Sequence, residues 1–305
     1  MSLETPEINT ADLRPWAGLV PAEDRTADVT IAGVPFEGEA FYRRGTALAP
    51  ERIRRLSAVM PPVTETGRLI DVAVRDIGDA TLFEGGVEPN IEPVAQWLLE
   101  HVEGVQVVLG GDHTVAIPSV LASHRRHGPD LAVITFDAHP DVCDTSHGSR
   151  WNIGCAVRRA IEVAGIPPGR LTQVGVRDFD LEEVLYLEAE GVNFTTMRDA
   201  AALPPPAMRE RLLRAVPRGA PVHLSLDIDV LDPAFAPGTE IPSAGGATTR
   251  QVLEWLAALG DCHLVALDLV EVSPPLDHSD ITSFAALKLI FEFLGLLAET
   301  HRAAP

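Results

Sequence analysis

The feature that most constrains the fold of this chain is a series of short apolar runs separated by stretches with helical spacing. Short apolar runs bounded by polar and turn-forming residues are typical of buried strands. They lie at residues 28–34, 69–72, 105–109, 131–136, 172–176, 222–228 and 263–270. Because strands that alternate with helices form parallel sheets covered on both faces, the pattern predicts an α/β fold with a mainly parallel central sheet. Ligands of such sheets gather beyond the carboxyl ends of the strands.

The 305 residues form either one large α/β domain or two smaller ones by length alone. No linker, repeat or low-complexity segment interrupts the middle of the chain. We therefore expect an N-terminal arm over residues 1–28 and a single domain over residues 29–305. The arm is polar and lacks an apolar segment preceded by basic residues, so we expect no signal peptide.

The formal net charge is −20, and the three cysteines are Cys143, Cys155 and Cys262. A chain this acidic is poorly suited to binding nucleic acid or an anionic membrane, whereas it favours a small cationic substrate. Three cysteines without a CxxC motif predict reduced thiols in a cytoplasmic protein. The apolar stretch Phe284–Ala298 contains Lys288 and Glu292, so we expect a core-facing helix that is too short and too charged to span a bilayer.

The stretch Asp137-Ala138-His139-Pro140-Asp141 directly follows the apolar run at residues 131–136. Side chains alternate between the faces of a strand, so residues 137, 139 and 141 share one face if the extended geometry continues. Two carboxylates and an imidazole in one place are unfavourable unless a positive charge lies between them. The stretch therefore predicts a metal site.

Two further strand ends offer ligands of the same kind. Asp227 and Asp229 end the run at residues 222–228, and His113 follows Gly110-Gly111-Asp112 after the run at residues 105–109. Six ligands with four carboxylates exceed the needs of one tetrahedral zinc ion. They suit two divalent ions with shared Asp bridges, and oxygen-rich ligation with some imidazole favours manganese.

The three segments, together with Asp268-Leu-Val-Glu-Val-Ser-Pro274, resemble the ureohydrolase family of arginases and agmatinases from about residue 29 to residue 298. The resemblance implies a three-layer α/β/α sandwich, a homo-oligomer (trimer or hexamer) and two Mn²⁺ ions per subunit. It assigns His113 and Asp141 to one ion, His139 and Asp229 to the other, and Asp137 and Asp227 to the bridging positions.

The resemblance also implies catalytic and substrate-binding roles for His147 and Glu271. Our hypothesis is that a hydroxide bridging the two ions attacks the guanidinium carbon, and that the products are urea and a primary amine. Histidine is a common general acid and base, so His147 would pass a proton to the leaving amine. Glu271 matches the family's guanidinium-binding glutamate, and a carboxylate can orient a guanidinium through paired hydrogen bonds.

The substrate is inferred from the short link between Asp141 and His147. Arginases resemble one another in a longer loop here, which holds the carboxylate of arginine, and this chain lacks it. Gly238-Thr239-Glu240 and Pro242–Gly246 also look like agmatinases. We therefore expect an agmatinase-type enzyme of polyamine biosynthesis that converts agmatine to putrescine and urea.

Four alternatives remain open. A guanidinobutyrase or another guanidino-acid hydrolase is the main one, and an arginase is less favoured. A single-zinc deacetylase shares the general architecture but uses fewer carboxylates, so metal stoichiometry would distinguish it. A catalytically silent scaffold would normally have lost metal ligands, and this chain retains all six.

Some polar residues near these motifs have structural interpretations. His223 lies within an apolar run and is interpreted as a hydrogen-bonded core or rim residue. Asp112 and Asp232 are interpreted as turn residues, each with a supporting role near the ligands as the alternative. Arg177-Asp178 ends another strand, where it forms either a pocket rim or a salt-bridged turn.

Overall fold

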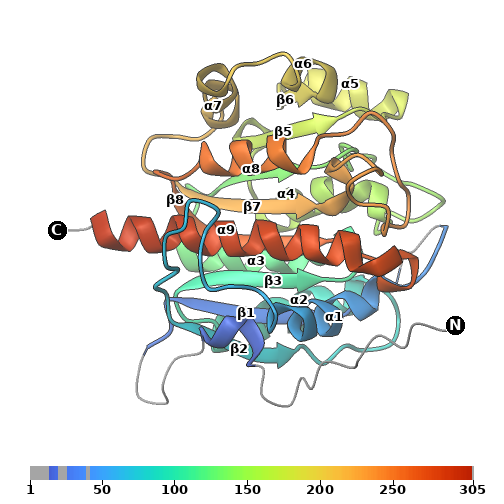
Figure 1. The fold of residues 1–305 in the computed structure, drawn as a ribbon. Helices are drawn as coiled ribbons and strands as arrows, with labels where there is room; N and C mark the ends of the chain where they lie inside the picture. The colour runs from blue at the N-terminus through green and yellow to red at the C-terminus, as the bar shows by residue number, and fades with distance from the viewer. Residues whose placement is uncertain (1–13, 20–25, 39–41, 304–305) are drawn as a thin grey trace, which may run out of the picture.

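The computed structural model describes residues 14–19, 26–38 and 42–303, and at its centre lies an eight-stranded parallel sheet (Figure 1). The strands are β1 (Val29–Val34), β2 (Val74–Asp79), β3 (Val105–Gly110), β4 (Ala132–Phe136), β5 (Leu171–Val176), β6 (Asn193–Thr196), β7 (Pro221–Asp227) and β8 (His263–Val270). Their order across the sheet is β2-β1-β3-β8-β7-β4-β5-β6. The expected α/β class with a parallel central sheet is confirmed.

Helices cover both faces of the sheet and complete the three layers (Figure 1). On one face the core includes side chains of α1 (Ala49–Ser57), α6 (Met197–Ala200), α7 (Pro205–Leu213), α8 (Thr249–Ala257) and α9 (Ile281–Ala303). On the other face it includes side chains of α2 (Glu88–His101), α3 (Ala116–His127), α4 (Ala156–Ala164) and α5 (Leu181–Ala189).

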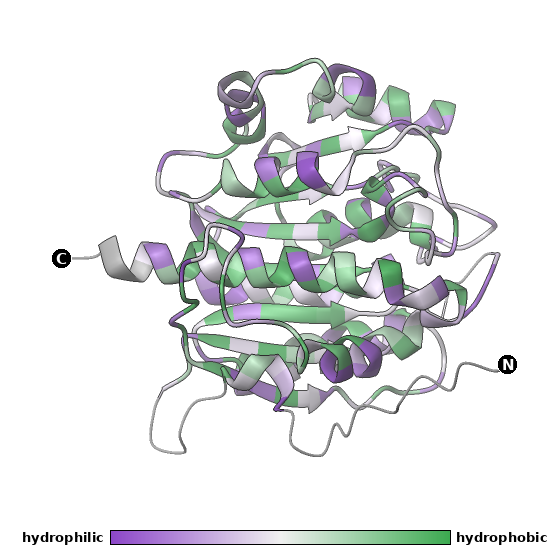
Figure 2. Ribbon diagram, viewed as in Figure 1, coloured by the Kyte–Doolittle hydropathy of each residue, from purple (hydrophilic) through white to green (hydrophobic). Residues whose placement is uncertain are grey.

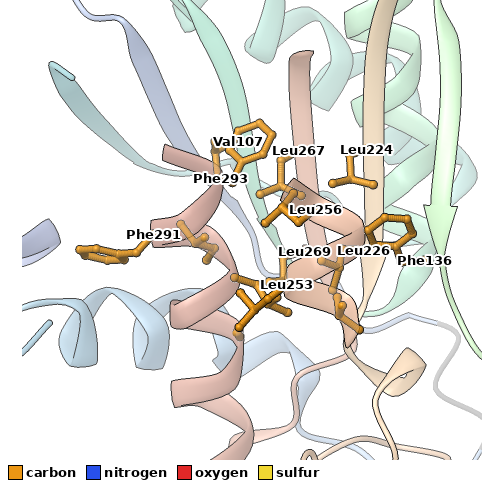
Figure 3. Close-up of a cluster of buried hydrophobic side chains, with 14 of the residues drawn as sticks. Val107, Phe136, Leu224, Leu226, Leu253, Leu256, Leu267, Leu269, Phe291 and Phe293 are labelled. Atoms are coloured by element: carbon orange, nitrogen blue, oxygen red, sulfur yellow. The ribbon is translucent and has the colours of Figure 1, made fainter. Parts of the chain in front are cut away.

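The central strands supply apolar side chains to both faces, as their continuous apolar runs predict. In β3, Val107 and Leu109 join the core under α8 and α9, whereas Val108 joins the core under α3. The α8–α9 side is packed with leucine and aromatic side chains (Figure 3). Phe136 of β4 meets Trp255 of α8 edge to face with 5.7 Å between ring centroids. These contacts fix the strand ends from which the polar motifs project.

Both edges of the sheet differ from the sequence-based expectation. Residues 69–72 were expected to form a strand, but the second strand is Val74–Asp79. The prediction was wrong because edge strands carry charged residues, so β2 lacks the apolar signal, while Ile70 and Val72 are buried without joining the sheet. The short polar strand Asn193–Thr196 at the other edge was missed for the same reason.

Helix α9 lies across the middle of the sheet and is apolar on several sides (Figure 2). The segment His278–Thr300 is long and apolar enough to cross a membrane. The expectation that this helix is too short was therefore wrong. However, 67 % of the apolar 18-residue stretch in this segment is buried inside the molecule, as is typical of a core helix.

Most of the expected N-terminal arm, residues 1–28, lies outside the described residues. Within residues 14–19, Trp16 is fully buried, and its indole Nε1 donates to Asp76 Oδ2 at 2.7 Å. The Leu19 carbonyl accepts a hydrogen bond from Val74 N at 2.8 Å. This short segment therefore packs against the β2 edge of the sheet.

Candidate metal centre

The six predicted ligands meet at the carboxyl edge of the sheet. His113 follows β3, Asp137 follows β4, and Asp227 is the last residue of β7. In the sheet, β8 separates β3 from β7, and β4 pairs with β7, so these ends are near neighbours. Parallel strands all end at the same edge, which is why segments more than 100 residues apart in sequence converge here.

Turns beyond the strands, and not extended strand geometry, bring the ligands together. Strand β4 ends at Phe136, and Asp141 has a positive φ of 54°. The Asp137 carboxylate accepts a hydrogen bond from His139 N at 2.7 Å, and Asp227 accepts one from Asp229 N at 2.8 Å. Each Asp therefore closes a tight turn through its own side chain. The predicted convergence is correct, but its predicted cause, alternation along a strand, is wrong.

One group of ligands surrounds His113. Its Nδ1 lies 2.9 Å from Asp141 Oδ2, 3.1 Å from Asp137 Oδ2 and 3.4 Å from Asp227 Oδ2. His113 and Asp137 are each about 1 % exposed, so water does not screen this arrangement. Neither His113 Nδ1 nor Asp137 Oδ2 has a hydrogen-bond partner of good geometry among the described residues. These atoms have the arrangement of ligands around a cation.

The second group surrounds His139. Its Nδ1 lies 3.0 Å from Asp229 Oδ2 and 3.8 Å from Asp137 Oδ1. Asp137 thus turns one oxygen toward each histidine, as a bridging ligand does. The ligand atoms of His113, Asp137 and Asp227 lie within 4.8 Å of one another, and so do those of Asp137, His139 and Asp229. Asp137 is the residue shared by the two groups.

The electrostatics of the site also favour cations. Burial and the charges of Asp229 and Asp141 together raise the pKa of Asp137 to about 7, although His113 lowers it. Burial opposes the charged form of His139, but the carboxylates around it, Asp229 first, outweigh burial and raise its pKa to about 10. Repelling carboxylates and histidines with raised pKa values indicate an excess of negative charge. This donor set of four carboxylates and two imidazoles fits two divalent ions.

A second buried group of polar residues lies behind the ligands and is closed by its own hydrogen bonds. Asp268 of β8 is fully buried and accepts hydrogen bonds from Ser119 Oγ at 2.7 Å, from Ser225 Oγ and from His223 Nε2. His223 Nδ1 pairs with Ser123 Oγ at 2.9 Å. The interpretation of His223 as a hydrogen-bonded core residue is confirmed. Ser225 Oγ also lies 3.2 Å from Nε2 of His113, a predicted ligand, and so links the two groups.

A pocket with a volume of about 260 Å³ opens beside His139 and Asp141. His147 lies in its wall, is solvent-exposed and has a positive φ of 49°. The remaining wall includes Cys143, Ser146, Asn152, Asp178, Asp180 and Glu183. The pocket-lining residues include no Lys or Arg among those the structure describes. The sequence motifs did not indicate Asp180 or Glu183, although their spacing forms a capping box that starts α5.

A smaller cavity, about 30 Å³, lies directly over the ligands and contains Glu271. Glu271 follows β8, has a positive φ of 65° and accepts a hydrogen bond from His113 N through Oε1 at 2.7 Å. Its Oε2 has no hydrogen-bond partner among the described residues. Burial raises the pKa of Glu271, as do the charges of Asp112 and Glu240. Glu240 lines the same cavity and was not among the predicted site residues.

The turn residues behave largely as interpreted. Asp112 Oδ1 accepts a hydrogen bond from Thr114 N at 3.1 Å, and Asp232 accepts from Ala234 N at 3.0 Å. Of the Arg177-Asp178 pair, Asp178 lines the pocket, as the pocket-rim alternative predicted. The Arg177 guanidinium instead donates to the carbonyls of Asp229, at 2.6 Å, and Ser243, at 2.9 Å. It therefore supports the loop that carries a ligand.

Comparison with known proteins identifies the family. The chain belongs to the arginase family, whose model matches residues 27–295. The proclavaminate amidinohydrolase of Streptomyces clavuligerus is 33 % identical over 92 % of this chain and 91 % of that protein. Its solved structure has a TM-score of 0.85 at 32 % identity and covers 95 % of this chain and 98 % of its own.

Other relatives of similar sequence identity bear the names of other enzymes. Guanidinopropionase of Pseudomonas aeruginosa is 32 % identical, with 98 % of each chain covered. The agmatinase of Chromobacterium violaceum is 31 % identical over 88 % of this chain and 84 % of that protein. The protein is thus an arginase-family hydrolase whose His and Asp clusters fit a binuclear metal site.

Proposed function

We propose that this protein hydrolyses agmatine to putrescine and urea, with two manganese ions per subunit. The observation that supports agmatine most directly is the acidic wall of the pocket beside the ligands. Asp178 and Asp180 lie there with Glu183, and no described Lys or Arg lines the pocket. A substrate that ends in an ammonium group is attracted to such a wall, whereas one that ends in a carboxylate is repelled.

Divalent ions held by these His and Asp residues would supply a water nucleophile at neutral pH, because a bound metal ion lowers the pKa of its water. The chain's own residues would then orient the substrate. Glu271 lines the small cavity, and its Oε2 has no partner among the described residues, so it can accept from a guanidinium that binds there. His147 lies in the pocket wall and is exposed, so it can exchange a proton with solvent and deliver it to the leaving amine.

A guanidino-acid hydrolase is the second candidate. Ser146 and Asn152 line the same pocket, and their hydroxyl and amide groups can donate to a carboxylate. Relatives named guanidinopropionase and guanidinobutyrase are as similar to this chain as the agmatinases are. We further propose that the enzyme is a cytoplasmic homo-oligomer, a trimer or hexamer, with residues 29–305 as its catalytic domain.

The test of the substrate is urea release by the manganese-loaded protein from agmatine, arginine, 3-guanidinopropionate and 4-guanidinobutyrate in parallel. We expect a strong preference for agmatine. In Asp178→Asn, we expect the KM for agmatine to rise. The control is Asp130→Asn, which should leave the KM unchanged because Asp130 is exposed just before the amino end of β4, away from the pocket. A preference for either guanidino acid contradicts the agmatine proposal and supports the second candidate.

The role of His147 has its own test. Replacing His147 with Asn should lower turnover while manganese content stays intact, because this residue is not among the ligands. His101→Asn is the matched control, since His101 is exposed at the end of α2. Unchanged turnover in His147→Asn would remove this residue from the mechanism.

A further inference from the structure

Glu240 is a buried carboxylate for which neither the metal ligands nor the fold accounts fully. It lies in the turn region after β7 and is 1 % exposed. Its Oε1 accepts hydrogen bonds from Tyr42 N and, at 3.4 Å, from Arg43 N. Its Oε2 has no hydrogen-bond partner among the described residues. A buried carboxylate oxygen without a partner is unfavourable, so this atom indicates a missing cationic or donor group.

The position of Glu240 indicates what that group is. Glu240 and Glu271 line the same small cavity over the ligands, together with Asp227 and Asp229. Each of the two glutamates has one oxygen, Oε2, without a partner among the described residues. Two such acceptors in one cavity suit a flat cation that has donors on more than one edge.

We propose that Glu240 is a second guanidinium-binding residue, which holds the substrate's head group together with Glu271. This inference rests on the proposed function insofar as the substrate is a guanidine. An alkylguanidinium has five N–H donors along three edges, and one carboxylate pairs with only one edge. A second carboxylate therefore adds orientation as well as charge, and both matter more inside a buried cavity than in water.

A purely structural role would explain only one of the two carboxylate oxygens of Glu240. Oε1 holds the backbone at Tyr42 and Arg43, and the Arg43 guanidinium donates to the Glu240 carbonyl at 2.8 Å. These contacts fasten the turn to the segment that follows β1. They leave Oε2 without a partner among the described residues, next to the cavity that Glu240 lines, and the turn does not require a charge at that atom.

The experiment uses Glu240→Gln, which keeps an acceptor for Tyr42 N and Arg43 N but replaces the second oxygen with a donor. The probe is methylguanidinium, whose methyl proton signal broadens when it binds near manganese in the fully loaded protein. We expect binding about tenfold weaker or more, as for the loss of a charged hydrogen bond. Glu100→Gln, which makes the same charge change on an exposed site of α2, should bind as the wild type does.

Two outcomes overturn the proposal in distinct ways. Unchanged methylguanidinium binding in Glu240→Gln would mean that Glu240 only anchors the turn. Lower manganese content would mean that it is a metal ligand and not a substrate-binding residue. If Glu240→Gln does not fold, Glu240→Asp, which keeps a carboxylate but shortens the side chain, replaces it and must show the same loss. Failure of the wild type to cleave agmatine rejects the proposed substrate alone, because methylguanidinium lacks the tail and still tests Glu240.

Discussion

Two buried groups of histidine and aspartate lie next to each other at the same end of the sheet, yet their hydrogen bonding is opposite. In the group around Asp268, each oxygen of the carboxylate accepts from a neighbour, and His223 uses both ring nitrogens. In the group around His113, Nδ1 faces three carboxylate oxygens within 3.4 Å. The first group is complete without a ligand, whereas the second needs a cation.

The comparison shows that residue type and burial do not by themselves distinguish a metal site from a polar core. Asp268 and Asp137 are both fully buried aspartates at the carboxyl half of the sheet. The charge of His223 and three hydrogen bonds outweigh burial and lower the pKa of Asp268, whereas burial and like charges raise the pKa of Asp137. Whether the partners donate or repel decides the role.

The largest expected effect comes from removing a predicted metal ligand from the group around His113. Asp137→Asn should lose bound manganese and reduce urea release by more than about a hundredfold, the upper range for residues that merely support ligands. Metal content by mass spectrometry and urea formation measure the two losses. Full metal occupancy in this variant would show that the two groups do not differ as described.

Removing a hydrogen-bond partner from the group around Asp268 should mainly lower the stability of the fold. Asp268→Asn leaves buried His223 without its carboxylate, so we expect a loss of about 3 kcal/mol in the free energy of unfolding. Urea unfolding followed by circular dichroism measures it. A loss below about 1 kcal/mol would show that the hydrogen bonds around Asp268 contribute little.

Ser225 joins the two groups, and its removal tests that link. In Ser225→Ala, His113 loses its hydrogen bond on Nε2, and we expect manganese affinity to fall about tenfold. Ser119→Ala is the matched control, because Ser119 Oγ also donates to Asp268 but forms no hydrogen bond with a predicted metal ligand in the described part of the chain. Equal metal affinities in the two variants would disprove the link.

The smallest effect concerns His127 at the end of α3, which shows what burial does to a histidine without a carboxylate to stabilise its charge. Burial, then the charges of Arg126, His263 and His223, lower the pKa of His127 to about 4. Between pH 4 and about 6.5, His127 binds a proton in the unfolded chain but not in the folded protein. Acidification through this range therefore favours the unfolded chain, and the stability that is present above pH 6.5 is lost. His127→Gln should therefore lose about 1 kcal/mol less than the wild type between pH 7 and pH 5. Unfolding curves of both proteins at pH 7 and pH 5 measure these losses. Equal losses of stability in the variant and the wild type would show that His127 remains solvated.

Sequence-based reasoning predicted the central strands well because their apolar runs face a helix layer on each side. It misplaced β2 and missed β6, since edge strands need not be apolar. All six predicted ligands converge, although through turns at Asp137 and Asp227 and not through strand alternation. Periodicity describes a regular strand, and it stops being informative where the strand ends.

The sequence by itself determined the fold class and the ligand types, because apolar runs and DxD-type motifs act through local chemistry. The tertiary structure alone decided which polar residues are satisfied, since that depends on contacts between segments far apart in the chain. Glu240 illustrates the difference: its sequence position indicates a turn, but it lines the same small cavity as Glu271, and its Oε2 has no partner among the described residues. Only the packing of β7 and β8 with the turns that follow them places those two carboxylates together.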